Sequence, residues 1–154
     1  MQTRREMLSQ SARVAAMLAA VGMLPAVAQA QGTYNTAAFA AKNMAELMKA
    51  LGAGAPVESK DVTVTGPDIA ENGAVVPVGA STALPGVKRL LILVEKNPSM
   101  LTAMFDVTDS VDANMSTRVK MGQSSDVFAV AMMNDGKVLF AKKEVKVTLG
   151  GCGG

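Results

Sequence analysis

The sequence predicts an all-β fold, an antiparallel β-sandwich preceded by one helix. From residue 61 onward, short apolar or alternating runs recur at a spacing of roughly 8 to 12 residues, with turn residues between them. Strands do not alternate with helices, as a parallel sheet would require. A chain of 154 residues, 49% of them hydrophobic, has the size of one domain with one core. We expect a sandwich of immunoglobulin-like type, and the strand spacing leaves a small closed barrel as the alternative.

One amphipathic helix is expected over residues 36–51. Its apolar side chains recur at helical spacing, at Phe39, Met44, Leu47, Met48 and Leu51. Thr36 is available as the N-cap, and Gly52 and Gly54 mark the end of the helix. We expect this helix to cover an edge or a face of the core.

The expected strands number seven or eight, in residues 61–65, 73–78, 87–95, 102–107, 114–121, 126–133, 137–142 and 144–149. Pro77 interrupts its segment and therefore predicts an edge strand or a bulge. The apolar centre of 87–95 predicts a strand covered on both faces. The run 127–133 is also apolar at nearly every position, so its second face is covered either by a partner protein or by the predicted helix. Both alternatives are open at this point.

The first 30 residues have the pattern of an export signal. Arginines at the start precede an apolar stretch over residues 14–27, and the sequence AQA at 28–30 is a typical cleavage site. The alternative, a buried or membrane-spanning helix, is disfavoured because a span needs about 20 apolar residues. The paired Arg4 and Arg5, followed by Glu6-Met7-Leu8, resemble the twin-arginine signal. We expect residues 1–30 to direct a folded domain to the bacterial periplasm.

The mature chain is expected to be electrically neutral. The whole sequence has 15 Lys and Arg against 13 Asp and Glu, and the signal segment removes three arginines and one glutamate. Nucleic-acid and anionic-lipid surfaces need an excess of positive charge. Stacking surfaces need aromatic residues, and the chain has no Trp, one Tyr and four Phe. We therefore expect neither nucleic-acid binding nor stable membrane insertion after cleavage.

The residue inventory excludes most catalytic and metal sites. The chain contains no histidine and one cysteine, so it cannot assemble a Ser-His-Asp or Cys-His pair, a histidine-based metal or haem site, or a four-thiolate site. Asp106, Asp109 and Asp112 lack the glycine and the distal glutamate of a calcium loop and indicate a solvated turn. We expect no metal and no cofactor.

The one strong nucleophile, Cys152, lies in the sequence GGCGG at residues 150–154. It cannot form an intramolecular disulfide, although the predicted compartment is oxidising. The flanking Gly150, Gly151, Gly153 and Gly154 carry no Cβ, which predicts a flexible arm. Five extended residues reach at most about 17 Å, enough to carry a thiol into the cleft of a neighbouring protein. The predicted domain organisation is thus a signal over 1–30, a carrier domain over 31–149 and an arm over 150–154.

Four segments of the chain resemble the SoxY family, the sulfur-carrier subunits of the periplasmic thiosulfate-oxidising Sox system. These segments are IAENGAVVPV (69–78), LPGVKRLLILVEKNP (84–98), STRVKMGQSSDVFAV (116–130) and VKVTLGGCGG (145–154). The resemblance implies an immunoglobulin-like sandwich that forms a heterodimer with a SoxZ subunit. It implies that Cys152 receives sulfur from thiosulfate at a haem-containing protein. A hydrolase and an oxidase or dehydrogenase then act on the adduct, so the chain is a carrier and not an enzyme.

The same residues are compatible with two other functions, or with a cysteine that has no function. The chain could be an adaptor sandwich that dimerises through a Cys152 to Cys152 disulfide, which non-reducing gels would detect. It could be a stand-alone thiol enzyme, which would require a lowered thiol pKa. The remaining alternative is an incidental cysteine in a glycine-rich end, which is disfavoured because an unpaired exposed thiol is a liability in an oxidising compartment.

The thiol of the isolated protein is expected to react slowly with iodoacetamide near neutral pH. Only the thiolate reacts, and nothing in the sequence places a cation or a helix N-terminus beside Cys152. A thiol with an ordinary pKa of about 8.5 is only a few per cent ionised at pH 7. The alkylation rate should match that of a free GGCGG peptide and rise with pH. A much faster rate in the protein would favour the thiol enzyme.

Overall fold

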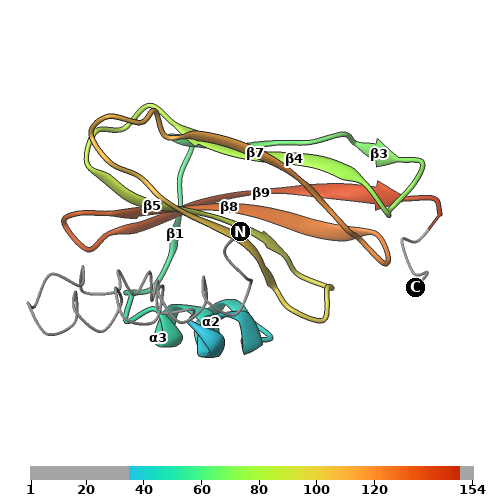
Figure 1. Cartoon of the computed structure of the whole chain (residues 1–154), viewed down its shortest axis with the longest axis horizontal. Helices are drawn as coiled ribbons and strands as arrows, with labels where there is room; N and C mark the ends of the chain where they lie inside the picture. Colours follow the sequence, from blue (N-terminus) through green and yellow to red (C-terminus); the bar gives the residue numbers. More distant parts are fainter. Residues whose placement is uncertain (1–34, 150–154) are drawn as a thin grey trace, which may run out of the picture. The chain divides into compact units, whose positions relative to one another are not determined.

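The structure, a computed structural model, describes residues 35–149 and consists there of two β-sheets with two helices (Figure 1). The helices are α2 (Thr36–Ala40) and α3 (Met44–Ala50). The strands are β1 (Val57–Glu58), β2 (Val62–Thr65), β3 (Ile69–Ala70), β4 (Val76–Thr82), β5 (Val87–Val94), β6 (Leu101–Asp106), β7 (Asn114–Val119), β8 (Ser125–Met133) and β9 (Val138–Val147). The predicted signal segment lies outside the described residues, Arg4 and Arg5 included. No helix within residues 35–149 is long and apolar enough to cross a membrane.

The two sheets form a sandwich, which confirms the predicted fold class. In the described part of the chain, the larger sheet has the strand order β1-β9-β8-β5-β6, with β3 also paired to β9, and the smaller sheet has the order β2-β4-β7. The long strands pair antiparallel, as predicted. Two short strands differ from the expectation, because β1 and β3 run parallel to β9. In Figure 1 the smaller sheet lies on one side of the larger sheet and the helices lie on the other.

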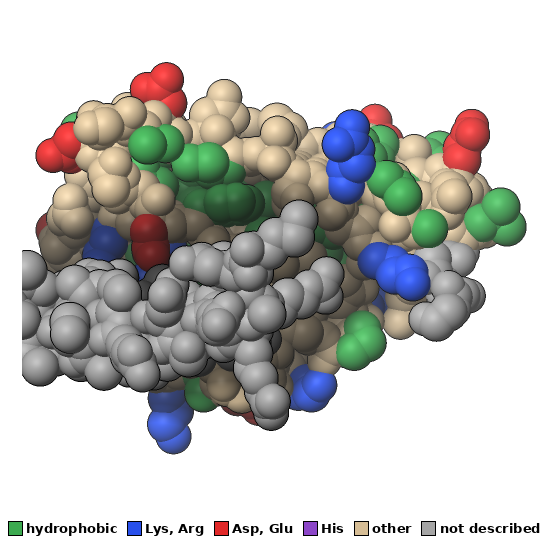
Figure 2. All heavy atoms as spheres, in the orientation of Figure 1, with side chains coloured by type: hydrophobic (Ala, Val, Ile, Leu, Met, Phe, Trp, Pro, Cys, Tyr) green, Lys and Arg blue, Asp and Glu red, His purple; other side chains and the backbone are tan. Residues whose placement is uncertain are grey.

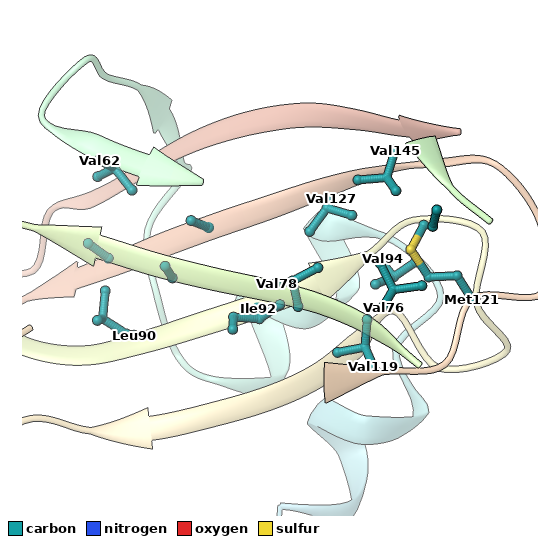
Figure 3. Close-up of a cluster of buried hydrophobic side chains, with 14 of the residues drawn as sticks. Val62, Val76, Val78, Leu90, Ile92, Val94, Val119, Met121, Val127 and Val145 are labelled. Atoms are coloured by element: carbon teal, nitrogen blue, oxygen red, sulfur yellow. The ribbon is translucent and has the colours of Figure 1, made fainter. Parts of the chain in front are cut away.

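The first core fills the space between the two sheets (Figure 3). Alternate residues of the two central strands point into it, namely Leu90, Ile92 and Val94 of β5 and Val127, Ala129 and Ala131 of β8. The smaller sheet contributes valines that include Val62, Val76, Val78 and Val119. The residues between the inward ones in β5 and β8 are also apolar and must be covered from the other side.

A second core lies between the larger sheet and the helices. Leu91 and Leu93 of β5 and Val130 of β8 are completely buried there. They pack in one cluster with Ala38 of α2 and Leu47 of α3. The helical segment therefore covers Val130 on the second face of the run 127–133, as one of the two alternatives predicts, while Phe128 and Met132 of this face are partly buried.

The helical segment consists of two helices, so the prediction of one continuous helix over residues 36–51 is wrong. Asn43 is extended (φ −145°, ψ 167°) and its side chain accepts a hydrogen bond from the backbone N–H of Glu46, which begins α3. Glu46 in turn accepts hydrogen bonds from the side-chain amide of Asn43 and from the backbone N–H of Lys42, both at 2.9 Å. This reciprocal cap starts a new helix inside the predicted one. The N-cap of α2 is Asn35 rather than Thr36, and Gly52 ends α3 with a φ of +63°.

Two strand predictions are corrected by the structure. The segments 137–142 and 144–149 form one continuous strand, β9, which pairs with β8 across Lys142 and Lys143. Pro77 lies in β4, the middle strand of the smaller sheet and not an edge strand. β2 nevertheless pairs only with Gly79–Thr82 of β4. At Pro77, β4 is therefore paired with β7 on one side and has no β2 partner on the other. The missing N–H of proline is tolerated at such a position.

Replacing Gly79 with alanine is expected to destabilise the fold by about 1–3 kcal/mol. An added Cβ would meet the Thr65 hydroxyl and lie 3.0 Å from the backbone oxygen of Met115. Gly54→Ala is the matched control, since its nearest neighbour would be the Gly136 oxygen at 3.8 Å, an ordinary contact. Urea unfolding of the two variants should separate them clearly. Equal midpoints would show that the smaller sheet accommodates the methyl group.

Candidate functional site

The candidate site is the place from which the arm leaves the domain. Cys152 and the four glycines of the predicted arm lie outside the described residues, so their assignment stays a prediction. The structure describes the chain as far as Leu149, three residues before Cys152. We use the term arm root for residues 69–75 and 146–149, two segments that are joined by hydrogen bonds at residues 70, 71 and 73.

One side of the arm root is a ladder between the end of β9 and residues 69–73. Ile69 and Ala70 of β3 pair in parallel with Lys146 and Val147 of β9. Beyond the strands, the backbone N–H of Thr148 donates to the oxygen of Ala70 at 3.1 Å. The Thr148 hydroxyl donates to the oxygen of Glu71 at 3.0 Å. The ladder therefore continues past the end of β9.

Leu149, the last described residue, is itself held by this ladder. Its carbonyl oxygen accepts a hydrogen bond from the backbone N–H of Gly73 at 2.8 Å. The carbonyl oxygen of Gly73 accepts in turn from the N–H of Met121, whose side chain is completely buried in the core between the sheets. Leu149, after which the chain continues to Cys152, is thus connected to the core by two successive hydrogen bonds.

The opposite side of β9 is bonded to the segment between β7 and β8. The backbone N–H of Val147 donates to the hydroxyl of Ser124 at 2.8 Å. The next residue, Ser125, pairs with Val145 as the first residue of β8 in the ladder. The end of β9 therefore has partners on both sides, which fixes its direction.

Lys143 of β9 binds the segment that precedes β3. Its ammonium group donates to the carbonyl oxygen of Gly66 at 2.6 Å and lies 2.9 Å from a carboxylate oxygen of Asp68. The hydrogen bond from Lys143, and then its positive charge, lower the pKa of the Asp68 carboxyl below its usual value. The pair contributes above the usual carboxyl range and is lost as the pH falls through that lowered pKa. Asp68 is fully exposed, so this contribution is small.

The described part of the chain holds the end of β9 in place and shows no cluster of metal ligands there. Among residues 35–149, no three Cys, Asp or Glu side chains gather to hold a metal ion. Asp106, one of the three aspartates weighed as a calcium loop, pairs with Arg89 at 2.6 Å. Histidine, the usual partner of a reactive thiol, is absent from the sequence.

A groove of about 910 Å³ lies at the opposite end of the sandwich from the arm root. Val87 lines this groove and pairs with Met133 at the end of β8, whereas the arm root adjoins Ser125 at its start. β5 and β8 therefore separate the groove from the arm root by their whole length. Three extended residues span at most about 11 Å, so Cys152 does not reach this groove on its own domain.

The sequence predicts part of the arm root, since the expected strands 144–149 and 73–78 overlap it. It does not predict that β3 pairs with the end of β9. β3 has two residues, too few to show a periodic pattern. Asn72, whose side chain accepts from the backbone N–H of Ala74, was the available signal of a turn there.

The comparisons with known proteins agree with this geometry. The family model described as "Sulfur oxidation protein SoxY" matches residues 47–152, which include the arm root and end at Cys152. None of the curated proteins matches the chain.

Two solved structures are similar to the chain. One is the sulfur carrier protein SoxY from Chlorobium limicola f thiosulfatophilum, with 34% identity and a TM-score of 0.60, covering 67% of this chain and 93% of that chain. The other is a superoxide reductase (neelaredoxin) from Ignicoccus hospitalis, with 15% identity and a TM-score of 0.50, covering 56% of this chain and 78% of that one, a likeness of fold alone. The length of the family match and the identity to the sulfur carrier lead to one conclusion. The chain belongs to the SoxY family.

Proposed function

We propose that this chain carries sulfur derived from thiosulfate as a covalent adduct on Cys152 and presents it to separate enzymes. One observation carries the proposal: the only cysteine of a sulfur-carrier family member lies three residues beyond a hydrogen-bonded anchor, between pairs of glycines. Glycines add no side chains beside the thiol, so a narrow cleft can admit it. Gly150, Gly151, Gly153 and Gly154 are accordingly proposed as the arm.

The proposed chemistry begins with the formation of a disulfide bond. The Cys152 thiol and thiosulfate join through a new bond between Sγ and the sulfane sulfur, with the release of one proton and two electrons. The electrons pass to a haem-containing protein, which is reduced. Only a thiol forms this bond and survives as a persulfide afterwards, so the chemistry requires cysteine at this position.

The second proposed step releases sulfate. Water attacks the sulfonate sulfur of the adduct, and the bond between the two sulfur atoms derived from thiosulfate breaks. Sulfate and two protons leave, and the bonding electron pair stays on the carrier as the persulfide anion of Cys152. No electrons are exchanged with another molecule, so a hydrolase suffices. The persulfide then goes to an oxidase or dehydrogenase.

We assign catalysis to other proteins because this domain lacks the groups for it. Among the described residues, no cluster at the arm root could hold a metal ion, and the sequence has no histidine to act as a base. A carrier needs neither, because the enzymes that receive the arm supply catalysis, as they do for other carried groups. We further propose a heterodimer with a SoxZ-like subunit, and a periplasmic location reached through the twin-arginine signal.

Replacing Cys152 with serine is expected to abolish sulfate release from thiosulfate by the assembled system. Serine cannot form the bond to sulfur, and the change lies beyond β9, so the unfolding midpoint should be unchanged. Intact-mass spectrometry of the unreduced protein from thiosulfate-grown cells should show adducts on the wild-type chain and none on the variant.

A relocated thiol is the control for this experiment. Val57 is 60% exposed, so Val57→Cys in the Cys152→Ser background provides an accessible thiol away from the arm. This double variant should react with iodoacetamide and still release no sulfate. Sulfate release by Cys152→Ser itself would overturn the proposed function, and release by the double variant would show that the arm is unnecessary.

A further inference from the structure

The arm root carries an unusual share of the exposed apolar surface. Within residues 35–149, the large hydrophobic side chains that remain exposed are those of Val57, Ile69, Val75, Val111 and Leu149. Three of these five, Ile69, Val75 and Leu149, belong to the arm root, and we call them the apolar rim. Figure 2 shows hydrophobic side chains at this end of the domain, where β3 and β9 end. Exposed apolar side chains gathered at one place are typical of a binding surface.

The backbone holds the apolar rim in position. Ile69 precedes the buried Ala70 in β3, so strand alternation turns the Ile69 side chain outward. Val75 lies immediately before β4, whose first residue, Val76, is buried. Ile69 pairs with Lys146, and Leu149 is bonded to Gly73, two residues before Val75. The rim is therefore a fixed feature of the folded domain.

Because Cys152 is close to Leu149 in sequence, an enzyme that binds its thiol must contact the domain near the apolar rim. Cys152 is three residues beyond Leu149, so their Cα atoms are at most about 11 Å apart. An enzyme that receives the thiol inside a cleft must bring the mouth of that cleft within this distance of Leu149. Any deeper site forces the two protein surfaces together around the arm root.

We propose that the apolar rim is the docking surface for the enzymes that act on Cys152, through apolar side chains at the mouth of their clefts. This inference rests on the proposed function. The charged residues beside the rim have both signs, Asp68 and Glu71 against Lys146, so the site offers no field of a single sign to attract a partner. Apolar contact is non-directional, so one rim serves several enzymes in turn.

The test compares two double variants of the full mature chain with its partner subunit. The rim variant is Ile69→Ser with Leu149→Ser, and the control is Val57→Ser with Val111→Ser, which removes two exposed hydrophobic side chains elsewhere. Sulfate release from thiosulfate is measured against carrier concentration, with periplasmic proteins of thiosulfate-grown cells from which the native carrier has been removed. Urea midpoints and the iodoacetamide reactivity of Cys152 verify that fold and thiol are unchanged.

The rim variant should show a kcat/KM about tenfold lower than wild type, equivalent to about 1.4 kcal/mol, with kcat unchanged at saturating carrier. The control should remain within about twofold of wild type. Wild-type kinetics in the rim variant, or an equal loss in both variants, would overturn the docking surface. Loss of the partner subunit in sedimentation, with unchanged kinetics, would also overturn it and assign the rim to the contact with that subunit.

The two proposals fail in different ways. Sulfate release that survives Cys152→Ser overturns the carrier function, and the rim then has no role in it. Loss of release in Cys152→Ser, together with wild-type kinetics in the rim variant, retains the carrier and rejects only the docking surface.

Discussion

The fold depends on the need to cover both faces of the central strand pair, β5 and β8. Leu90, Leu91, Ile92 and Leu93 are four consecutive residues of β5, and all are completely buried. Consecutive residues of a strand point to opposite faces, so such a strand is stable only between two apolar layers. The smaller sheet supplies one layer and the helices supply the other. The three-layer architecture follows from this requirement.

The same strand pair determines where the candidate site lies. β8 pairs with β9 from Ser125 to Met132, and this ladder sets the direction in which β9 leaves the sheet. The loop through β3 and Gly73 then holds the end of β9 and reaches back to the buried Met121. The described domain thus sets the position of Leu149, the residue after which the chain continues to Cys152.

The sandwich could be predicted from the sequence because the long strands are periodic or continuously apolar. Such patterns can be recognised in one segment without knowing which strand it pairs with. The split between α2 and α3 was predictable in principle, since Asn43 and Glu46 have the spacing of a cap. The continuity of β9 was not, because the charged residues Lys142, Lys143 and Glu144 interrupt its apolar pattern, and the contacts of Lys143 with Gly66 and Asp68 are visible only in the structure. Cys152 could be singled out by composition alone. The arm root could not, because its hydrogen bonds join residues 77 apart in sequence, such as Thr148 and Glu71.

The parallel pairing of β3 with β9 has a mechanical consequence. A pull on Leu149 along the axis of β9 loads the hydrogen bonds to β8, which lie perpendicular to the strands, together with the slanted bonds to β1 and β3. Such bonds are loaded together in shear and do not open one after another, as they would if β9 were peeled away sideways. An enzyme that draws in the residues beyond Leu149 therefore pulls against the whole sheet. The domain resists unravelling in the one direction in which a carrier would be pulled.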